Sequence, residues 1–473
     1  MPLILGTNSI KDTGFQVANS CRFNGADSHS MARTISAGSS GKIYTISFWM
    51  KKSAEDTINN IFHLSSDGNT AAYIEVATKS NYGIDFQFKD GSGGTFLRRR
   101  ITRDFRDFSA WMNIVLRFDS TNSTASDRAR IYVNGIQATD VDQDSTPDVP
   151  LNFVSDLNTS GATLVIGKNI STGFSSHYDG YLAEMVLIDG SSLGPDSFGE
   201  FDSDSPTIWK PIDVSGLTFG TNGFYLDFED SSSLGNDSAG SNNFTVTNLT
   251  SLNQSIDTCT NNFATWDPNN RNTSMGSFHH GNLEYEVDAS FFRTAFATFG
   301  ADQGKWYFEC KRITGSSFSI GIISLDYKNR TSNVSYIGGA GDATNNIGYL
   351  KDGNISIGGS ETSGYASYGN GETVMVAMDL DNGKVYFGVD GTWGNSGNPE
   401  SGATGTGAVS FTPSGETWTF AVSVFDSHWE ANFGSPMYSI TSGNSDGEGI
   451  GNFEFTVPSG YFSMCSRNLA EYG

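Results

Sequence analysis

Short runs in which apolar and polar side chains alternate recur along the whole sequence. Residues 44–50 read YTISFWM, residues 112–118 read MNIVLRF and residues 418–424 read WTFAVSV, each with an apolar side chain at every second position. Successive side chains of a β-strand point to opposite faces, so this period of two predicts strands that bury one face. No long run follows the helical period, and we expect only a short helical turn at residues 195–201. The alternation therefore predicts an all-β fold.

Turn-forming residues separate these runs. The chain contains 55 glycines, and several of them follow Asn or Asp between two alternating segments. Such pairs favour the two-residue hairpin turns in which both central positions have positive φ. The pairs begin at Asn134, Asp179, Asp189, Asp352 and Asp390. Short strands joined by such turns predict antiparallel sandwiches rather than alternating strands and helices.

The 473 residues exceed the ~100–200 residues of one typical domain, so more than one module is expected. The two halves of the chain also resemble each other, because residues 130–135 (RIYVNG) and residues 384–391 (KVYFGVDG) share a basic, aliphatic, Tyr, apolar pattern that ends in a glycine turn. The segment between the halves is polar and turn-rich, yet residues 224–228 (FYLDF) are too apolar for a free linker. We expect this segment to be an ordered bridge that contributes edge strands to one or both modules.

These observations predict two jelly-roll/β-sandwich domains in series, joined by an ordered strand-and-loop bridge. The expected divisions are an N-terminal arm (1–14), a first sandwich (15–200), the bridging region (201–302), a second sandwich (303–436) and a C-terminal extension (437–473).

Charge and cysteine usage exclude several classes of protein. The net charge is −24, and phosphate neutralisation needs clustered Lys and Arg, so nucleic acid is not an expected partner. The one basic run, Arg98 to Arg106, is interpreted as a solvated strand end or an inter-subunit contact. No apolar run approaches the ~20 residues of a membrane span, and no basic leader precedes an apolar stretch, so neither membrane insertion nor a signal peptide is expected. The four cysteines are far apart and form no C-x-x-C pair, which predicts free thiols and assembly in a reducing cytoplasm.

Six segments of the first half follow one another in a characteristic order and spacing. They are CRFNG (21–25), YTISFWM (44–50), WMNIVLRFD (111–119), IYVNG (131–135), LVIG (164–167) and DGYLAEM (179–185). Together they resemble the concanavalin A-like, LamG-type jelly roll.

A second set of segments lies in the second half. It comprises GKWYFE (304–309), SIGI (319–322), IGYL (347–350), YGNGE (368–372), MDLDNGKVYF (378–387) and WTFAV (418–422). This set resembles a SPRY-type β-sandwich. The two modules together with TNNFA (260–264) and CSRNL (465–469) are similar to appendage or fibre proteins of tailed phages. This resemblance implies a virion protein made in the host cytoplasm, with other virion proteins as partners and a homo-oligomeric, preferentially trimeric, state.

Aromatic residues in polar or glycine-rich loops are the candidate glycan contacts, because their flat apolar faces suit sugar rings. They are His177, Tyr178, Tyr365, Tyr368 and Trp393. We expect Tyr365, Tyr368 and Trp393 to line one exposed loop face. The alternative for Trp393 is a buried plug under its loop.

No cofactor is required by these patterns, but the LamG-type resemblance implies one metal site. Asn24, Asp27 and Asp179 would supply hard oxygen ligands to calcium if the first strand neighbours the Asp179–Gly180 turn. Turn formation by the same residues is the alternative.

Catalytic residues are not expected. The related glucanases use carboxylates in the pattern E-x-D-x-x-E, which this chain lacks. The nearest candidate is the acidic strand of Glu284, Glu286 and Asp288, which lies outside the LamG-like segment. We expect no pair of carboxylates in a cleft with room for a sugar ring.

The function expected from the sequence is therefore that of a non-catalytic virion protein, a tail or head appendage that binds host-surface polysaccharide for attachment. A structural capsid decoration or fibre protein packed against other virion subunits is the alternative. A glycan-cleaving enzyme is the third possibility, and it lacks its carboxylate pattern.

Overall fold

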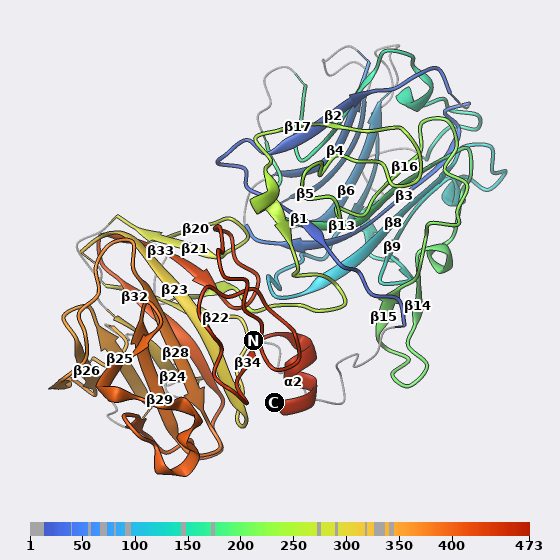
Figure 1. The fold of residues 1–473 in the computed structure, drawn as a ribbon. Coiled ribbons are helices and arrows are strands. Elements are labelled where there is room, and N and C mark those ends of the chain that lie inside the picture. The colour runs from blue at the N-terminus through green and yellow to red at the C-terminus, as the bar shows by residue number, and fades with distance from the viewer. Residues whose placement is uncertain are drawn as a thin grey trace. The chain divides into compact units, whose positions relative to one another are not determined.

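The computed structural model describes residues 14–38, 40–54, 58–66, 73–79, 82–89, 96–142, 148–171, 176–271, 276–288, 292–316, 319–325, 336–339 and 345–473. The chain forms two compact units, which divide between Thr260 and Asn261. We call Asp12–Thr260 the first unit and Asn261–Gly473 the second unit. Each is built from β-sheets (Figure 1), which confirms the predicted all-β fold.

The first unit contains two large antiparallel sheets. One has the order β10 (Ile136–Gln137), β9 (Ala129–Val133), β8 (Trp111–Asp119), β3 (Ile43–Lys52), β13 (Gly180–Asp189), β1 (Ser20–Phe23) and β18 (Gln254–Ser255), and β16 (Phe224–Leu226) also pairs with β13. The other has the order β11 (Val141–Asp142), β7 (Phe96–Ile101), β6 (Tyr82–Lys89), β5 (Tyr73–Lys79), β4 (Asn59–Ser65), β12 (Thr163–Ile166), β2 (Ser30–Thr34) and β17 (Thr245–Thr247). A separate hairpin joins β14 (Gly199–Phe201) to β15 (Trp209–Pro211).

The core of the first unit explains the alternation in its sequence. Tyr44, Ile46, Phe48 and Met50 of β3 are buried in the same cluster as Phe86 and Phe88 of β6, together with Phe118 of β8. Aromatic pairs such as Tyr44 and Phe118, whose ring centroids lie 4.6 Å apart, join strands within this core.

The second unit also contains two sheets. The first has the order β19 (Trp266–Arg271), β22 (Arg293–Ala297), β32 (Trp418–Val424), β24 (Ser319–Ser324), β25 (Asn346–Leu350), β26 (Asn354–Ile357) and β27 (Ser360–Ser363). The second has the order β20 (Ser277–His279), β21 (Glu284–Val287), β33 (Ser427–Asn432), β23 (Lys305–Gly315), β28 (Thr373–Asp379), β29 (Lys384–Val389) and β30 (Thr392–Trp393), with β31 (Val409–Ser410) against β29 and β34 (Phe462–Ser463) against β23. Trp306, Phe308 and Phe420 lie in the shared core.

Helical structure is confined to short pieces in the described residues. The 3₁₀ turns are η1 (Ala125–Asp127), η2 (Asp156–Asn158), η3 (Pro195–Ser197), η4 (Ser251–Asn253), η5 (Gly394–Ser396) and η6 (Pro399–Thr404), and α2 (Ser466–Tyr472) is an α-helix. The expected turn near residues 195–201 is η3. Among these residues no helix has the length and apolar character that a membrane crossing demands.

The segment between the predicted sandwiches is divided between the two units. Its first part supplies β16, β17 and β18 to the first unit, and its second part supplies β19 to β22 to the second unit. The C-terminal extension also belongs to the second unit, because β34 runs parallel to β23. Within the extension, the rings of Phe462 and Tyr472 stack with their centroids 3.8 Å apart. All four cysteines are free thiols, as expected.

The predicted hairpin turns follow the type I′ pattern at two of the five pairs. Asn134 and Gly135 have φ values of 47° and 77°, and Asp390 and Gly391 have φ values of 43° and 81°. At the other three pairs only the glycine has positive φ, so the type I′ prediction is wrong for them. Asp352 and Gly353 nevertheless lie in the turn that joins the antiparallel strands β25 and β26. The hairpin interpretation is wrong for Asp179 and Asp189, because they lie at the ends of β13, which does not pair with the strand before or after it in the chain.

The basic run starting at Arg98 makes its strongest contacts inside the first unit. Arg98 Nε lies 2.9 Å and Arg100 Nη2 lies 3.0 Å from the two carboxylate oxygens of Asp85, whose side chain is fully buried. Arg106, in contrast, is 75% exposed and pairs with Asp104 at 3.1 Å. The interpretation of the run as a solvated strand end is therefore wrong for Arg98 and Arg100, because the β6–β7 register places them opposite Gln87 and Asp85.

Glu184 is a buried carboxyl at a bulge of β13. Its φ is 48°, its residue is 6% exposed, and the Tyr225 hydroxyl donates a hydrogen bond to its Oε2 at 2.7 Å. Burial raises the pKa of Glu184 from 4.5 to about 8, against the opposing effect of the Tyr225 hydrogen bond. A group whose pKa is raised on folding contributes stability that is complete below its unfolded pKa and is lost as the pH rises through its folded pKa.

We expect Glu184→Gln to flatten the dependence of the first unit's stability on pH. Glutamine keeps the acceptor for the Tyr225 hydroxyl but cannot ionise. At about pH 9 the free energy of unfolding of the variant should therefore exceed that of the wild type by ~2–4 kcal/mol. Below about pH 4.5 the two proteins are expected to agree within ~1 kcal/mol, since Glu184 is then protonated in both states. Thermal denaturation of both proteins across this pH range measures the difference. If stability depends on pH in the same way in both proteins, the raised pKa of Glu184 is not its cause.

Candidate functional site

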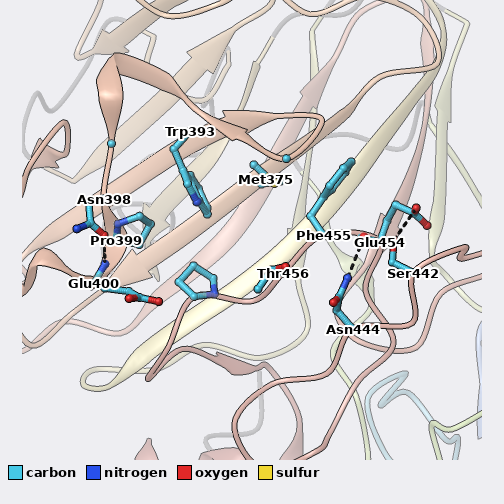
Figure 2. Close-up of a pocket in the computed structure, with 13 residues that line it drawn as sticks. Met375, Trp393, Asn398, Pro399, Glu400, Ser442, Asn444, Glu454, Phe455 and Thr456 are labelled. Carbon is cyan, nitrogen blue, oxygen red and sulfur yellow. Dashed lines mark hydrogen bonds between the residues drawn. The ribbon is translucent and has the colours of Figure 1, made fainter.

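The second unit contains a cavity of about 610 Å³ between the β30 region and the C-terminal extension. Its lining comes from separated parts of the chain, namely Met375, Gly391, Trp393, Gly397, Asn398, Pro399, Glu400, Ser442, Asn444, Glu454, Phe455, Thr456 and Pro458. This volume lies within the ~300–1,000 Å³ of typical small-molecule sites. Figure 2 shows the Trp393 and Phe455 side chains on either side of Met375, with Asn398 and Glu400 toward one end and Ser442, Asn444 and Glu454 toward the other.

The Asp390–Gly391 turn places Trp393 at the cavity. β30 pairs back onto β29 after this turn, and the Trp393 ring then contacts Tyr307 and Tyr386 edge to face, with centroid distances of 6.3 Å and 6.5 Å. Gly391 also allows Phe455 to approach, because a Cβ atom there would lie 3.0 Å from Phe455 Cδ1. Trp393 remains partly exposed, so its ring has both a packed edge and an accessible surface.

Polar side chains at one end of the cavity are fixed by the η6 segment. Asn398 Oδ1 accepts a hydrogen bond from the Glu400 backbone N–H at 3.0 Å, which caps the 3₁₀ turn. Glu400 Oε1 in turn accepts from the Ser459 backbone N–H at 2.9 Å. These bonds connect the η6 segment to the C-terminal extension.

The opposite end of the cavity is built within the extension itself. Glu454 accepts hydrogen bonds from the Thr441 backbone N–H at 2.7 Å and from Ser442 Oγ at 3.1 Å. Asn444 Nδ2 donates to the Glu454 backbone carbonyl at 3.0 Å. The side chains that line this end are therefore held in place before any ligand arrives, and pre-organised groups cost less entropy on binding.

A buried carboxyl on β23 supports the wall that carries Glu454 and Phe455. Glu309 accepts hydrogen bonds from the backbone N–H groups of Phe455 at 2.8 Å and Glu454 at 3.0 Å, and from the Tyr307 hydroxyl at 2.9 Å. Asn432 Nδ2 lies 3.4 Å from the same carboxyl. Burial raises the pKa of Glu309 to about 7, although these donors oppose the shift.

Of the three aromatic residues expected on one exposed loop face, one lines this cavity. Trp393 is in the lining, whereas Tyr368 is 3% exposed, belongs to the core cluster and donates its hydroxyl to the Tyr349 carbonyl at 3.0 Å. Tyr365 is half-buried against that core, and its hydroxyl donates to the Gly407 carbonyl at 3.0 Å. The prediction is wrong for Tyr368, because the loop folds back onto the sandwich and its backbone N–H bonds the Lys351 carbonyl.

The aromatic candidates of the first unit occupy different environments. Tyr178 is fully buried, its ring packs against Phe23, and its hydroxyl donates to the carbonyls of Lys51 and Tyr181 at 3.2 Å and 3.1 Å. The prediction that Tyr178 contacts a glycan is therefore wrong. His177 is partly exposed and pairs through its backbone with Lys168, and its role in glycan binding stays a prediction.

The three calcium candidates lie close together, as the resemblance implied. Asp179 Oδ1 accepts from the Gly25 backbone N–H at 2.6 Å, and Asn24 Nδ2 donates to Asp27 Oδ2 at 2.8 Å. The carboxylates suit calcium, but Asn24 turns its amide nitrogen, rather than its oxygen, toward Asp27. Within the described ranges no group of three or more His, Cys, Asp or Glu side chains is arranged to hold a metal ion. The contacts fit the turn-forming role of these residues, and calcium binding stays a prediction.

The carboxylate expectations need one correction. Glu400 and Glu454 both line the cavity, so the expectation that no carboxylate pair lies in a cleft with room for a sugar ring is wrong. The acidic strand at residues 284–288 is no such site, because Glu284 is largely buried and pairs with His428 at 3.0 Å and with His280 at 3.3 Å. Burial opposes the shift, but the hydrogen bond and charge of His428 hold the pKa of Glu284 below its usual value.

Most of the cavity residues were missed in the sequence. Glu454, Phe455, Ser442 and Asn444 lie in the C-terminal extension, whose short polar segments carry no alternating run longer than residues 453–457 (FEFTV). The signal was the alternation of Phe453, Phe455 and Val457, which resembles one short strand and does not reveal what that segment packs against.

Comparison with known proteins matches part of the first unit to a family. Residues 24–194 match the model of the Laminin_G_3 family, described as the concanavalin A-like lectin/glucanases superfamily, which supports the LamG-type fold. No curated protein matches the sequence.

Several solved structures are similar to parts or most of the chain. Domains LG4-5 of the mouse laminin alpha1 chain are 10% identical, with 97% of this chain and 89% of that chain covered and a TM-score of 0.30. The SPRY domain of human HERC1 is 11% identical, with 35% and 96% covered and a TM-score of 0.28. A proposed carbohydrate-binding protein from Bacteroides ovatus is 14% identical, with 50% and 61% covered and a TM-score of 0.34.

Proposed function

We propose that this protein is a non-catalytic phage virion component, a tail or head appendage that attaches to host-surface polysaccharide through the cavity of its second unit. The observation that carries the proposal is the cavity of about 610 Å³ in which the Trp393 and Phe455 rings accompany six polar side chains. Aromatic rings offer apolar surface to the faces of sugars, while a small number of fixed polar groups orient the hydroxyls.

Two further observations support glycan as the ligand class and binding as the activity. The family whose model matches residues 24–194 is named for lectins and glucanases. Glu400 and Glu454 each accept a hydrogen bond from a backbone N–H, so both carboxylates hold wall segments in place. That structural use supports binding rather than hydrolysis.

The virion assignment rests on the resemblance of the two modules and of residues 260–264 and 465–469 to tailed-phage appendages. On this proposal the protein is made in the host cytoplasm, packs against other virion proteins and acts as a homo-oligomer, with a trimer favoured. A net charge of −24 keeps such a particle component from adhering to nucleic acid.

We expect the purified protein to bind members of an array of bacterial polysaccharides, and Trp393→Ala to weaken this binding by ~10–100-fold, as loss of a central aromatic contact does. Trp393→Leu, which keeps apolar bulk but removes the flat ring, is expected to weaken it to a similar degree. Periodate oxidation of the glycans is expected to abolish binding, and no reducing sugar should be released.

The matched control is Phe201→Ala in the first unit, which removes an aromatic side chain that is 41% exposed and lies outside the cavity. This variant should bind like the wild type. Binding that survives Trp393→Ala would place the glycan site elsewhere, release of reducing sugar would favour the enzyme, and absence of binding would favour a structural decoration protein.

A further inference from the structure

The charges that line the cavity are all of one sign. Glu400 and Glu454 contribute two carboxylates, and the described residues of the lining include no Lys, Arg or His. A bound acidic group would therefore lie beside like charges with no cation to offset them, in a protein that already carries a net charge of −24.

Four backbone N–H groups at the cavity wall already donate hydrogen bonds within the protein. Anion sites without basic side chains use unpaired backbone N–H groups, which point at the ligand. Here the N–H groups of Phe455 and Glu454 donate to Glu309, on the far side of the wall. Those of Thr441 and Ser459 donate to Glu454 and Glu400 themselves.

The same carboxylates suit a ligand that donates hydrogen bonds. An ionised carboxylate accepts up to about four hydrogen bonds, so Glu454 and Glu400 keep acceptor capacity after their protein contacts. Hydrogen bonds from hydroxyls to carboxylates are shorter and stronger than bonds between neutral groups. Sugar hydroxyls are such donors, and Trp393 and Phe455 supply the apolar surface that an uncharged sugar ring can cover.

We propose that the cavity selects a neutral glycan segment, bound through hydroxyl donation to Glu400 and Glu454 and through contact with the Trp393 ring, and that it rejects uronic-acid and sulfated sugars. This inference rests on the proposed glycan-binding function. Selectivity arises from both the new hydrogen bonds and the repulsion of the wrong ligand.

The test compares neutral, uronic-acid and sulfated oligosaccharides of similar length on one array, with the wild type, Trp393→Ala, Glu400→Gln and the Glu400→Gln/Glu454→Gln double variant. The wild type is expected to bind neutral members at least ~10-fold more tightly than acidic ones, with binding that depends on Trp393. The double variant should narrow this preference by ~3–10-fold, because the amides keep an acceptor oxygen but carry no charge. Glu400→Gln alone, which retains an acceptor for the Ser459 N–H, covers the case in which the double variant does not fold.

A second measurement is independent of any substitution. Raising the ionic strength screens like-charge repulsion, so the wild type's preference for neutral glycans should shrink with added salt. Tighter, Trp393-dependent binding of uronic-acid or sulfated glycans would overturn this inference and leave the proposed function intact. If no glycan on the array is bound in a way that depends on Trp393, both the proposed function and this inference are overturned.

Discussion

Replacing Asp85 by asparagine is expected to lower the free energy of unfolding of the first unit by about 3–5 kcal/mol. The Asp85 carboxylate is fully buried and faces two guanidinium groups, Arg98 at 2.9 Å and Arg100 at 3.0 Å. Gln87 Nε2 donates to the same carboxylate at 2.8 Å. The substitution removes the shared counter-ion of two largely buried guanidinium groups, and breaking a buried ion pair is more costly than losing an exposed one.

Hydrogen exchange followed by mass spectrometry can measure this effect in the intact chain, since peptides from β5 to β7 report on the first unit and peptides from β23 and β28 serve as an internal reference. Asp140→Asn is the matched control, because Asp140 also pairs with an arginine, Arg103 at 3.4 Å, but the two side chains are 30% and 49% exposed. Exposed pairs contribute ~0–1 kcal/mol, so this variant should change stability little. Equal effects of the two substitutions would mean that burial does not set the strength of the Asp85 contacts.

The basic run illustrates which parts of the fold were predictable from sequence. Alternation identified residues 44–50 and 112–118 as strands, because that signal is local and one face of each strand is buried. Alternation could not show that Arg98 and Arg100 are largely buried while Arg106 is exposed, because the burial of Arg98 and Arg100 depends on the strand that lies beside β7. The β6–β7 register pairs Arg100 with Asp85 and Arg98 with Gln87, and register depends on contacts between distant residues.

The candidate site shows the same limit more strongly. Tyr368 and Trp393 both lie beside glycines in polar loops, and their local sequences do not separate them. Tyr368 is buried by the Tyr349 and Trp429 rings, whereas Trp393 lines a cavity closed by Phe455 from the C-terminal extension. Trp393 could be proposed as a ligand contact from its residue type alone. The cavity could not be predicted, because it forms only where the C-terminal extension folds back onto the second sandwich.

Glu309→Ala is expected to lower the stability of the second unit by about 2–5 kcal/mol and to weaken glycan binding at least ~10-fold. Alanine leaves the backbone N–H groups of Glu454 and Phe455 without their acceptor, and each unsatisfied buried donor costs ~1–3 kcal/mol. Binding falls as well, because these residues form the wall opposite Trp393 and lose the support that holds them in position. Hydrogen exchange on peptides that cover residues 453–456 and affinity for the best array glycan give the two readouts.

Glu309→Gln tests whether the hydrogen bonds, rather than side-chain bulk, hold the wall. Its amide oxygen can accept from one of the two backbone N–H groups, whereas its amide nitrogen faces the other as a second donor, so an intermediate loss of ~1–3 kcal/mol is expected. Tyr307→Phe provides the control, since it removes one donor to Glu309 at 2.9 Å but leaves both wall contacts intact and should preserve glycan affinity. If alanine and glutamine variants bind glycan like the wild type, Glu309 contributes to the core of the second unit without positioning the cavity. If binding falls in the order wild type, glutamine, alanine while the phenylalanine variant binds normally, the buried carboxyl on β23 positions the wall through its backbone contacts.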